Sequence, residues 1–204
     1  MKVIEDVTSE PLTLAECRLH LRVDASEDSD GGTHPDDSLI TALLTASREV
    51  CEAFTGLSFA RKTLEIAIDV FPLSTDPGGL PIELPFGPVL DVQSISWGDA
   101  SDDEMAAVDY TLDDYRLPNR VYPVATEWPT VTAATNLIKI RYLAGYGVDS
   151  DGGTALPYAA RAAMLLVLGH LYENREDTVD KQMFELPYGA QALLRPLRVR
   201  LGMA

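Results

Sequence analysis

The chain has 204 residues, of which 46% are hydrophobic and 24% are charged, and this is the composition of an ordinary globular protein with a sizeable core. Its 16 Lys and Arg residues face 32 Asp and Glu residues, and the net charge of -16 argues against a surface that grips DNA through its phosphates. The acidity is uneven, because residues 1–110 hold 6 basic and 22 acidic side chains, whereas residues 111–204 hold 10 of each.

The first third of the chain predicts two helices. Thr13 and Glu16 have the spacing of a capping box, so a short helix is expected to begin there. After a loop rich in Asp, Ser and Gly, Asp36 or Asp37 caps a second helix that ends at Gly56. Apolar side chains recur at helical spacing along this second helix and predict its buried face: Leu39, Leu43, Ala46, Val50 and Phe54.

The middle of the chain predicts strands. From Ser58 onward the period changes to two, most clearly between residues 64 and 70, which is the pattern of a half-buried strand. Turn-rich pieces separate three further candidates, at residues 89–97, 109–117 and 136–143. We therefore expect an antiparallel sheet of about four strands. Trp97, Trp128 and most tyrosines lie on or beside these strands, where the core of the sheet is their expected place.

Helical signals return near the C-terminus. Pro157 suits a first helical turn, and the segment from there to about Arg175 is apolar nearly all round, so it is expected at the centre of a core. A last helix starts at about Tyr188 and meets Pro196, which should end or kink it.

These elements predict an α+β fold, with a mainly α-helical core of about four helices and an antiparallel β-sheet inserted between the second and third helices. We expect a single domain in which residues 10–57 and 155–204 form the helical core and residues 58–148 form the β insertion. No association with a membrane is expected, because the longest apolar stretch, residues 162–169, is far shorter than the ~20 residues of a membrane span.

The side chains do not predict a catalytic centre. None of the three histidines has a second His or Cys at metal-ligand spacing, and no Ser or Thr has a nearby base. Cys17 and Cys51 fall on the apolar sides of predicted helices, where free buried thiols are expected. The hexapeptide Asp-Ser-Asp-Gly-Gly-Thr occurs at residues 28–33 and 149–154, but both copies fit a calcium loop poorly and are expected to be solvated loops. We therefore expect no catalytic residue, no metal and no cofactor.

Six short segments, spread over nearly the whole chain, carry a family resemblance. They are Glu-Pro-Leu-Thr-Leu-Ala-Glu at residues 10–16, Cys-Glu-Ala-Phe-Thr-Gly at 51–56, the stretch from Leu80-Pro81 to Pro88-Val89, Ile-Arg-Tyr-Leu-Ala-Gly-Tyr-Gly at 140–147, the helix from Leu156-Pro157 to Leu-Tyr-Glu-Asn-Arg-Glu at 171–176, and Leu-Pro-Tyr-Gly-Ala at 186–190 with Leu-Leu-Arg-Pro at 193–196. In this order they resemble the head-to-tail connector or adaptor proteins of long-tailed bacteriophages and related gene transfer agents.

The resemblance implies a structural role without enzymatic activity. Such a protein would form a homo-oligomeric ring, a dodecamer, on the portal protein in the neck of the particle, after assembly in the cytoplasm of a bacterial host. The ring would extend the DNA channel, through which DNA passes without specific binding, and its far face would receive a stopper or tail-terminator protein.

The basic end of the chain is the candidate for docking on the portal. Pro196 would let the following residues leave the body of the subunit, and arginines suit carboxylates at an interface. The proposed docking residues are Leu193, Leu194, Arg195, Leu197, Arg198, Arg200 and Leu201. Alternatively, this segment completes the core of its own subunit and its arginines are solvated.

Two other functions are compatible with the sequence. The protein could be a neck stopper or a tail-terminator of the same kind of particle. In a different class, it could be an enzyme that binds a small molecule through the sheet insertion.

Overall fold

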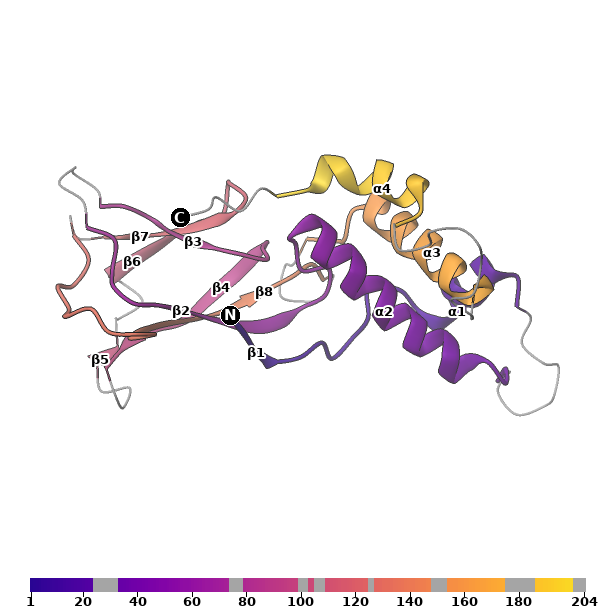
Figure 1. The fold of residues 1–204 in the computed structure, drawn as a ribbon, viewed down its shortest axis with the longest axis horizontal. Coiled ribbons are helices and arrows are strands. Elements are labelled where there is room, and N and C mark those ends of the chain that lie inside the picture. The colour runs from indigo at the N-terminus through magenta and orange to yellow at the C-terminus, as the bar shows by residue number, and fades with distance from the viewer. Residues whose placement is uncertain are drawn as a thin grey trace. The chain divides into compact units, whose positions relative to one another are not determined.

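A computed structural model of the protein describes residues 1–23, 33–73, 79–98, 103–104, 109–124, 127–147, 154–174 and 186–199. They contain four α-helices and two antiparallel sheets, which confirms the predicted α+β class (Figure 1). Most strands lie between the second and third helices in chain order, as expected, but one strand precedes the first helix.

The chain divides into two compact units. The β unit comprises Met1–Ser9, Gly56–Gly153 and Val199–Ala204, and the helical unit comprises Glu10–Thr55 and Thr154–Arg198.

The helical unit begins with α1 (Leu14–Leu21), which starts at the predicted capping box. The hydroxyl of Thr13 accepts a hydrogen bond from the backbone N–H of Glu16 at 3.2 Å, and the Glu16 carboxylate accepts one from the backbone N–H of Thr13 at 2.8 Å. These bonds satisfy two amide groups that a helix start would otherwise leave unpaired.

Helix α2 (Asp37–Thr55) has the predicted bounds, and Gly56 follows it with a φ of 73°. The predicted buried face of α2 is wrong. The positions predicted to be buried are only half-buried, and Val50 is 42% exposed. The inward face is rotated by one residue along the helix and consists of Ile40, Leu44, Ser47, Arg48, Cys51, Glu52 and Thr55. The pattern was misleading because two of these inward residues are charged and form an ion pair.

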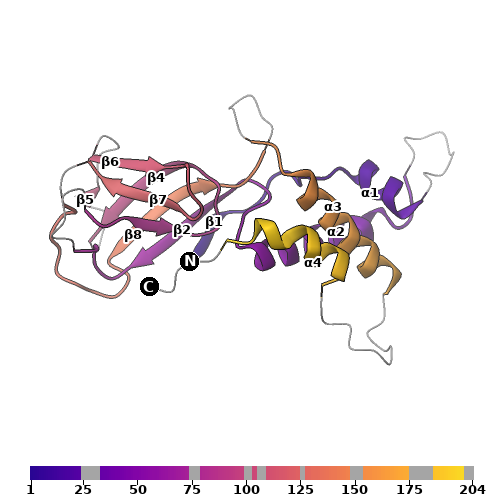
Figure 2. The ribbon, with the colours of Figure 1, turned by 90° about the horizontal axis from the view of Figure 1, so that it is seen from above.

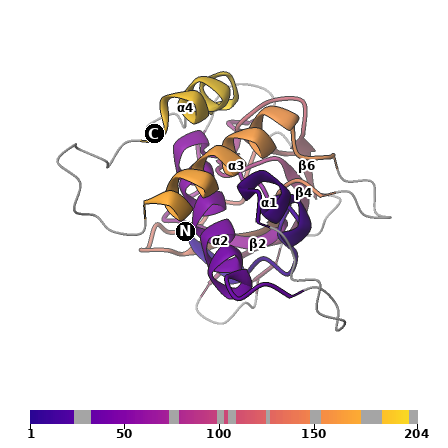
Figure 3. The same ribbon diagram turned by 90° about the vertical axis from the view of Figure 1, so that its right-hand side faces the viewer.

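Helix α3 (Tyr158–Glu173) follows Pro157 as expected and lies between α2 and α4 (Figure 3). Its inward face combines small and large apolar residues: Ala160, Ala163, Met164, Val167 and Leu168. The expectation of a helix buried all round is wrong, because Tyr158 is 89% exposed and Leu166 is 38% exposed. Helix α4 (Tyr188–Leu194) continues directly into the 3-10 helix η2 (Arg195–Leu197), so Pro196 changes the helix type at this point.

The β unit contains more strands than the sequence predicts. The larger sheet has the order β1 (Lys2–Glu5), β2 (Lys62–Ile68), β8 (Ile138–Ala144), β4 (Val89–Trp97) and β5 (Asp103–Glu104). The smaller sheet has the order β3 (Ile82–Leu84), β7 (Asn119–Pro123) and β6 (Tyr110–Asp113), and Figure 2 shows β6 and β7 side by side. The expected single sheet of about four strands therefore corresponds to β2, β4, β6 and β8, which belong to two sheets.

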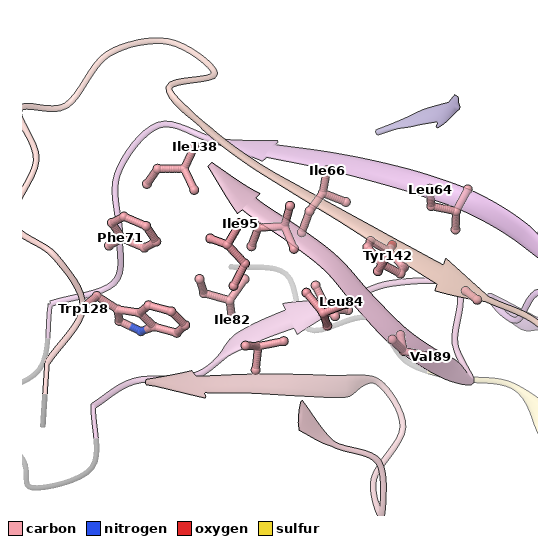
Figure 4. Packing of buried hydrophobic residues seen from close by; sticks show 14 residues of the cluster. Leu64, Ile66, Phe71, Ile82, Leu84, Val89, Ile95, Trp128, Ile138 and Tyr142 are labelled. Carbon is pink, nitrogen blue, oxygen red and sulfur yellow. The ribbon is translucent and has the colours of Figure 1, made fainter. Parts of the chain in front are cut away.

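Side chains from both sheets form the core of the β unit (Figure 4). Ile95 of β4 and Ile82 of β3 point toward each other across this core. Trp128 stacks on Phe71 with 5.3 Å between ring centroids, and its indole N–H donates to the carbonyl of Leu80 at 2.7 Å. The segment that carries Trp128 has no regular secondary structure, so this buried side chain ties it to the core.

No helix within the described ranges is both long enough and apolar enough to cross a membrane.

Candidate assembly surfaces

Among the proposed docking residues, Leu193 and Leu194 lie on α4, Arg195 and Leu197 lie on η2, and Arg198 follows η2 at the end of the helical unit. Packing of α4 buries Ala190 and Leu194 completely. The side-chain amide of Gln191 donates to the carbonyl of Leu186 at 2.8 Å, which ties the first turn of α4 to the residues before it. Leu194 therefore contributes to the core of its own subunit.

The remaining described residues of this segment are more accessible. Arg195 is exposed, and Leu193 and Leu197 are half-buried. The guanidinium of Arg198 lies 5.5 Å from the ring centroid of Phe54, a distance at which a cation–π interaction stabilises its position. Arg200 and Leu201 lie outside the described residues.

A buried ion-pair network holds the N-terminal part of the helical unit. Arg48 is 3% exposed, and its guanidinium donates to Glu10 at 2.9 Å and to Glu52 at 3.1 Å. Burial alone would lower the pKa of Arg48, but the hydrogen bond to Glu10 and the charges of Glu52 and Glu10 outweigh it and raise that pKa. The guanidinium therefore stays charged, and it fixes the residues before α1 against α2.

Two more arginines fix α1 itself. Arg18 pairs with Asp37 at the start of α2, and Arg161 of α3 pairs with Glu16. Arg161 also donates to the carbonyl of Pro11 at 2.7 Å. Helix α1 is therefore anchored at several points within the helical unit.

The described residues contain no group of three His, Cys, Asp or Glu side chains that could hold a metal ion. Cys17 and Cys51 are free and buried as predicted, and burial raises the pKa of Cys17 to about 11 and that of Cys51 to about 12. Both thiols are protonated at neutral pH and are poor nucleophiles. Most of each Asp-Ser-Asp-Gly-Gly-Thr copy lies outside the described residues.

The β6–β7 hairpin carries an exposed surface that sequence reasoning missed. Tyr115 is 97% exposed and Leu117 is 48% exposed, and both lie beyond the end of β6 and not on the strand predicted for residues 109–117. The neighbouring Arg116 lies 3.8 Å from Asp113. The cis proline Pro118 directly precedes the buried Asn119, whose side-chain oxygen accepts from the backbone N–H of Val89 at 2.9 Å, and the other cis proline, Pro88, directly precedes Val89. Only the prolines and the polar residues between 113 and 119 could have indicated this turn.

Solved structures show what the whole fold is similar to. The chain aligns over 100% of its length with 97% of a chain from the virion of a native gene transfer agent particle, with a TM-score of 0.75 and 22% identity. It aligns equally completely with 99% of a chain from the neck of an empty gene transfer agent particle, computed with C6 symmetry, with a TM-score of 0.71 and 26% identity. A chain from the neck of the native particle, computed with C12 symmetry, gives a TM-score of 0.69 and 24% identity over 99% of that chain.

The chain has the fold of a gene transfer agent neck protein. The alignments include both units, because they cover the chain from end to end. They confirm the resemblance to head-to-tail connectors that the six sequence segments indicated, at the level of a neck protein. No family model and no curated protein sequence matches the chain.

Proposed function

We propose that the protein is a head-to-tail adaptor that forms a ring on the portal protein of a gene transfer agent or tailed bacteriophage. The ring extends the DNA channel and provides the docking surface for the next neck or tail protein. The observation that carries this proposal is the end-to-end match with neck chains, one of them from a neck computed with C12 symmetry. Both units act together as one adaptor domain in this proposal.

The adaptor is favoured over a stopper or tail-terminator by the sequence resemblance, whose segments run in the order of the adaptor family. A catalytic role has less support, because both described cysteines are protonated and buried. The neighbours in solved structures are components of particles and necks.

The portal contact in this proposal is made by the C-terminal segment from Leu193 onward. Leu194 is buried, so the contact is left to the other residues proposed for docking: Leu193, Arg195, Leu197, Arg198, Arg200 and Leu201. Apolar side chains supply the contact area, since charge pairs at a wet rim contribute little by themselves.

DNA passes through the ring without specific binding in this proposal. The net charge of -16 would repel phosphates, and an acidic channel wall lets DNA slide where a basic wall would hold it.

Reconstitution with the portal protein tests the adaptor role. The purified chain is mixed with the portal and with no other neck protein, and the mass of the complex is measured by light scattering and its shape by electron microscopy. An adaptor forms a ring on the portal under these conditions. A stopper binds only after another adaptor is added, and an enzyme is indifferent to the portal, so either of these results would overturn the proposal.

A further inference from the structure

The outward face of α2 is apolar, although it is accessible to water. This face takes in most of the line that periodicity marks as buried, whose leucines and Ala46 are half-buried, and it is distinct from the line that packs inside the helical unit. Val50 is 42% exposed, and Ala42 and Ala53 are exposed beside it. The face comprises Leu39, Ala42, Leu43, Ala46, Val50 and Ala53. An exposed apolar stripe of this kind, on a helix about 28 Å long, is typical of an interaction surface.

A second apolar surface lies on α3 and α4. On α3 the residues Tyr158, Ala162 and Leu166 follow each other at intervals of four and are all exposed. A Cβ atom at Gly189 of α4 would lie 3.4 Å from Leu166, so the two helices meet here and form one continuous surface. Tyr188, which is 81% exposed, extends this surface along α4.

The two surfaces belong to different parts of the helical unit. Helix α3 lies between α2 and α4 (Figure 3), and on both α2 and α3 the exposed residues lie on another side of the helix than its buried residues. A contact between two different surfaces of identical subunits is head-to-tail, and such contacts close into a ring when the rotation per subunit is right.

One pair of exposed charges on the two surfaces is opposite in sign, and Glu173 of α3 adds a second exposed acidic residue on the side of Leu166. Within α2, all of which is described, Glu49 is the exposed charged residue beside the apolar face. On α4 and η2, Arg195 continues the exposed line of Tyr188 and Ala192. Neither Glu49 nor Arg195 forms an ion pair within the described part of the chain. Charge complementarity of this kind fixes the register of an interface.

We propose that the α2 face, with Glu49, binds the α3–α4 face, with Arg195, of the next copy of this chain in the ring. This inference rests on the proposed adaptor function and names the contact that builds the ring. A second copy is the occupant that fits, because this one chain carries both apolar faces, and the exposed charges beside them, Glu49 and Arg195, are opposite in sign. The inference assigns Arg195 to the ring contact and leaves the residues from Leu197 onward to the portal.

Cross-linking tests this contact in rings assembled on the portal. Val50→Cys and Ala192→Cys are combined in one chain, and a bis-maleimide linker of about 10 Å is added; both changes are at exposed positions. We expect a ladder of covalent oligomers on a denaturing gel from the double variant and monomers alone from each single variant. The wild-type chain, whose two cysteines are buried, is the control for linkage through native thiols.

Three results would overturn the inference. Covalent dimers from Val50→Cys alone would show that the α2 face of one subunit contacts the α2 face of another. Rings of normal mass without a ladder from the double variant would place the contact elsewhere, while leaving the adaptor function intact. Failure of the wild-type chain to form rings, seen by light scattering before any linker is added, would overturn both the adaptor function and the inference.

Charge reversal provides a second measurement without cross-linking. We expect Glu49→Lys and Arg195→Glu each to raise the concentration needed for ring formation about tenfold, because each places like charges opposite one another. The chain with both changes should return to within about threefold of the wild type. If the double variant is as impaired as the sum of the single variants, the two residues do not meet. Arg116→Glu, an exposed arginine of the β unit, is the matched control for a change in net charge.

Discussion

The guanidinium of Arg48 donates a hydrogen bond of 2.9 Å to the carboxylate of Glu10, and Arg48 is buried, with only 3% of its surface exposed. Its other partner, Glu52, is 4% exposed, so removal of the arginine would leave a buried carboxylate without its cation. We expect Arg48→Met to lower the free energy of unfolding by about 3 kcal/mol or more. Urea denaturation measures this. Arg141→Met removes a partly exposed pair with Glu65, should cost less than about 1 kcal/mol, and serves as the control. A loss from Arg48→Met as small as that expected for Arg141→Met would show that the Arg48 network contributes little to stability.

Acid should weaken the contact between α1 and α2. The hydrogen bond from Arg18, followed by one from the backbone of His34, lowers the pKa of Asp37 below its ordinary value of about 3.9. The unfolded chain therefore binds this proton more readily than the folded chain, so the stabilisation is fully present above pH ~4 and is lost as the pH falls through the lowered value. Asp37→Asn should lower the melting temperature at pH 6 and have progressively less effect toward pH 3. A difference between wild type and variant that is constant over this range would contradict the prediction.

Neither cysteine should react in the folded protein. With pKa values of about 11 and about 12, Cys17 and Cys51 are thiols rather than thiolates at pH 7.5, and both are buried. Ellman's reagent should detect no thiol in the native chain and both thiols in urea. Rapid labelling of either cysteine under native conditions would refute this and would show that the helical unit opens readily.

Added salt should favour ring formation. Subunits with a net charge of -16 repel one another, and the screening length falls from about 30 Å at 0.01 M salt to about 8 Å at 0.15 M. Light scattering over this range should show a shift from small species to rings. Rings that dissolve as salt is added would mean that ion pairs, rather than apolar faces, hold the subunits together.

Removal of the residues after Leu197 should separate portal binding from folding. The shortened chain keeps the buried Leu194 and loses the contact of Arg198 with Phe54, which is worth about 1 kcal/mol or less. We expect it to fold and to form rings at raised salt, but not to bind the portal in a pull-down assay. The full-length variant Arg198→Ala shows how much of the effect is due to the one arginine. Normal portal binding by the shortened chain would eliminate the segment as the docking site.

Local signals predicted elements well in this chain. The capping box of Thr13 and Glu16 and the proline before α3 each determine where a helix begins through residues close in sequence. The sequence alone therefore predicts these helix starts, without any tertiary contact. Strand β1 could not be predicted in this way, because all four of its residues are exposed and their placement depends on pairing with β2. Strand β3 has only three residues, too few to show a period.

The candidate surfaces were harder to predict than the fold. Periodicity identified an apolar line on α2 but could not show that Arg48 and Glu52 neutralise each other inside the unit, which leaves that line outside. The C-terminal segment was predicted as a helix, yet the burial of Leu194 depends on tertiary packing that its own sequence does not reveal. Charge complementarity between Glu49 and Arg195 becomes visible only when the exposed residues of both helices are known.

The two units are interleaved along the chain. The β unit is built from three stretches and the helical unit from two, so the backbone passes from one unit to the other four times. A single recombination point between residues 56 and 153 would therefore give a hybrid protein whose helical unit combines residues 10–55 of one parent with residues 154–198 of the other. Exchange of this protein between related particles is expected to succeed as a whole gene, and neither unit can be inherited as one continuous piece.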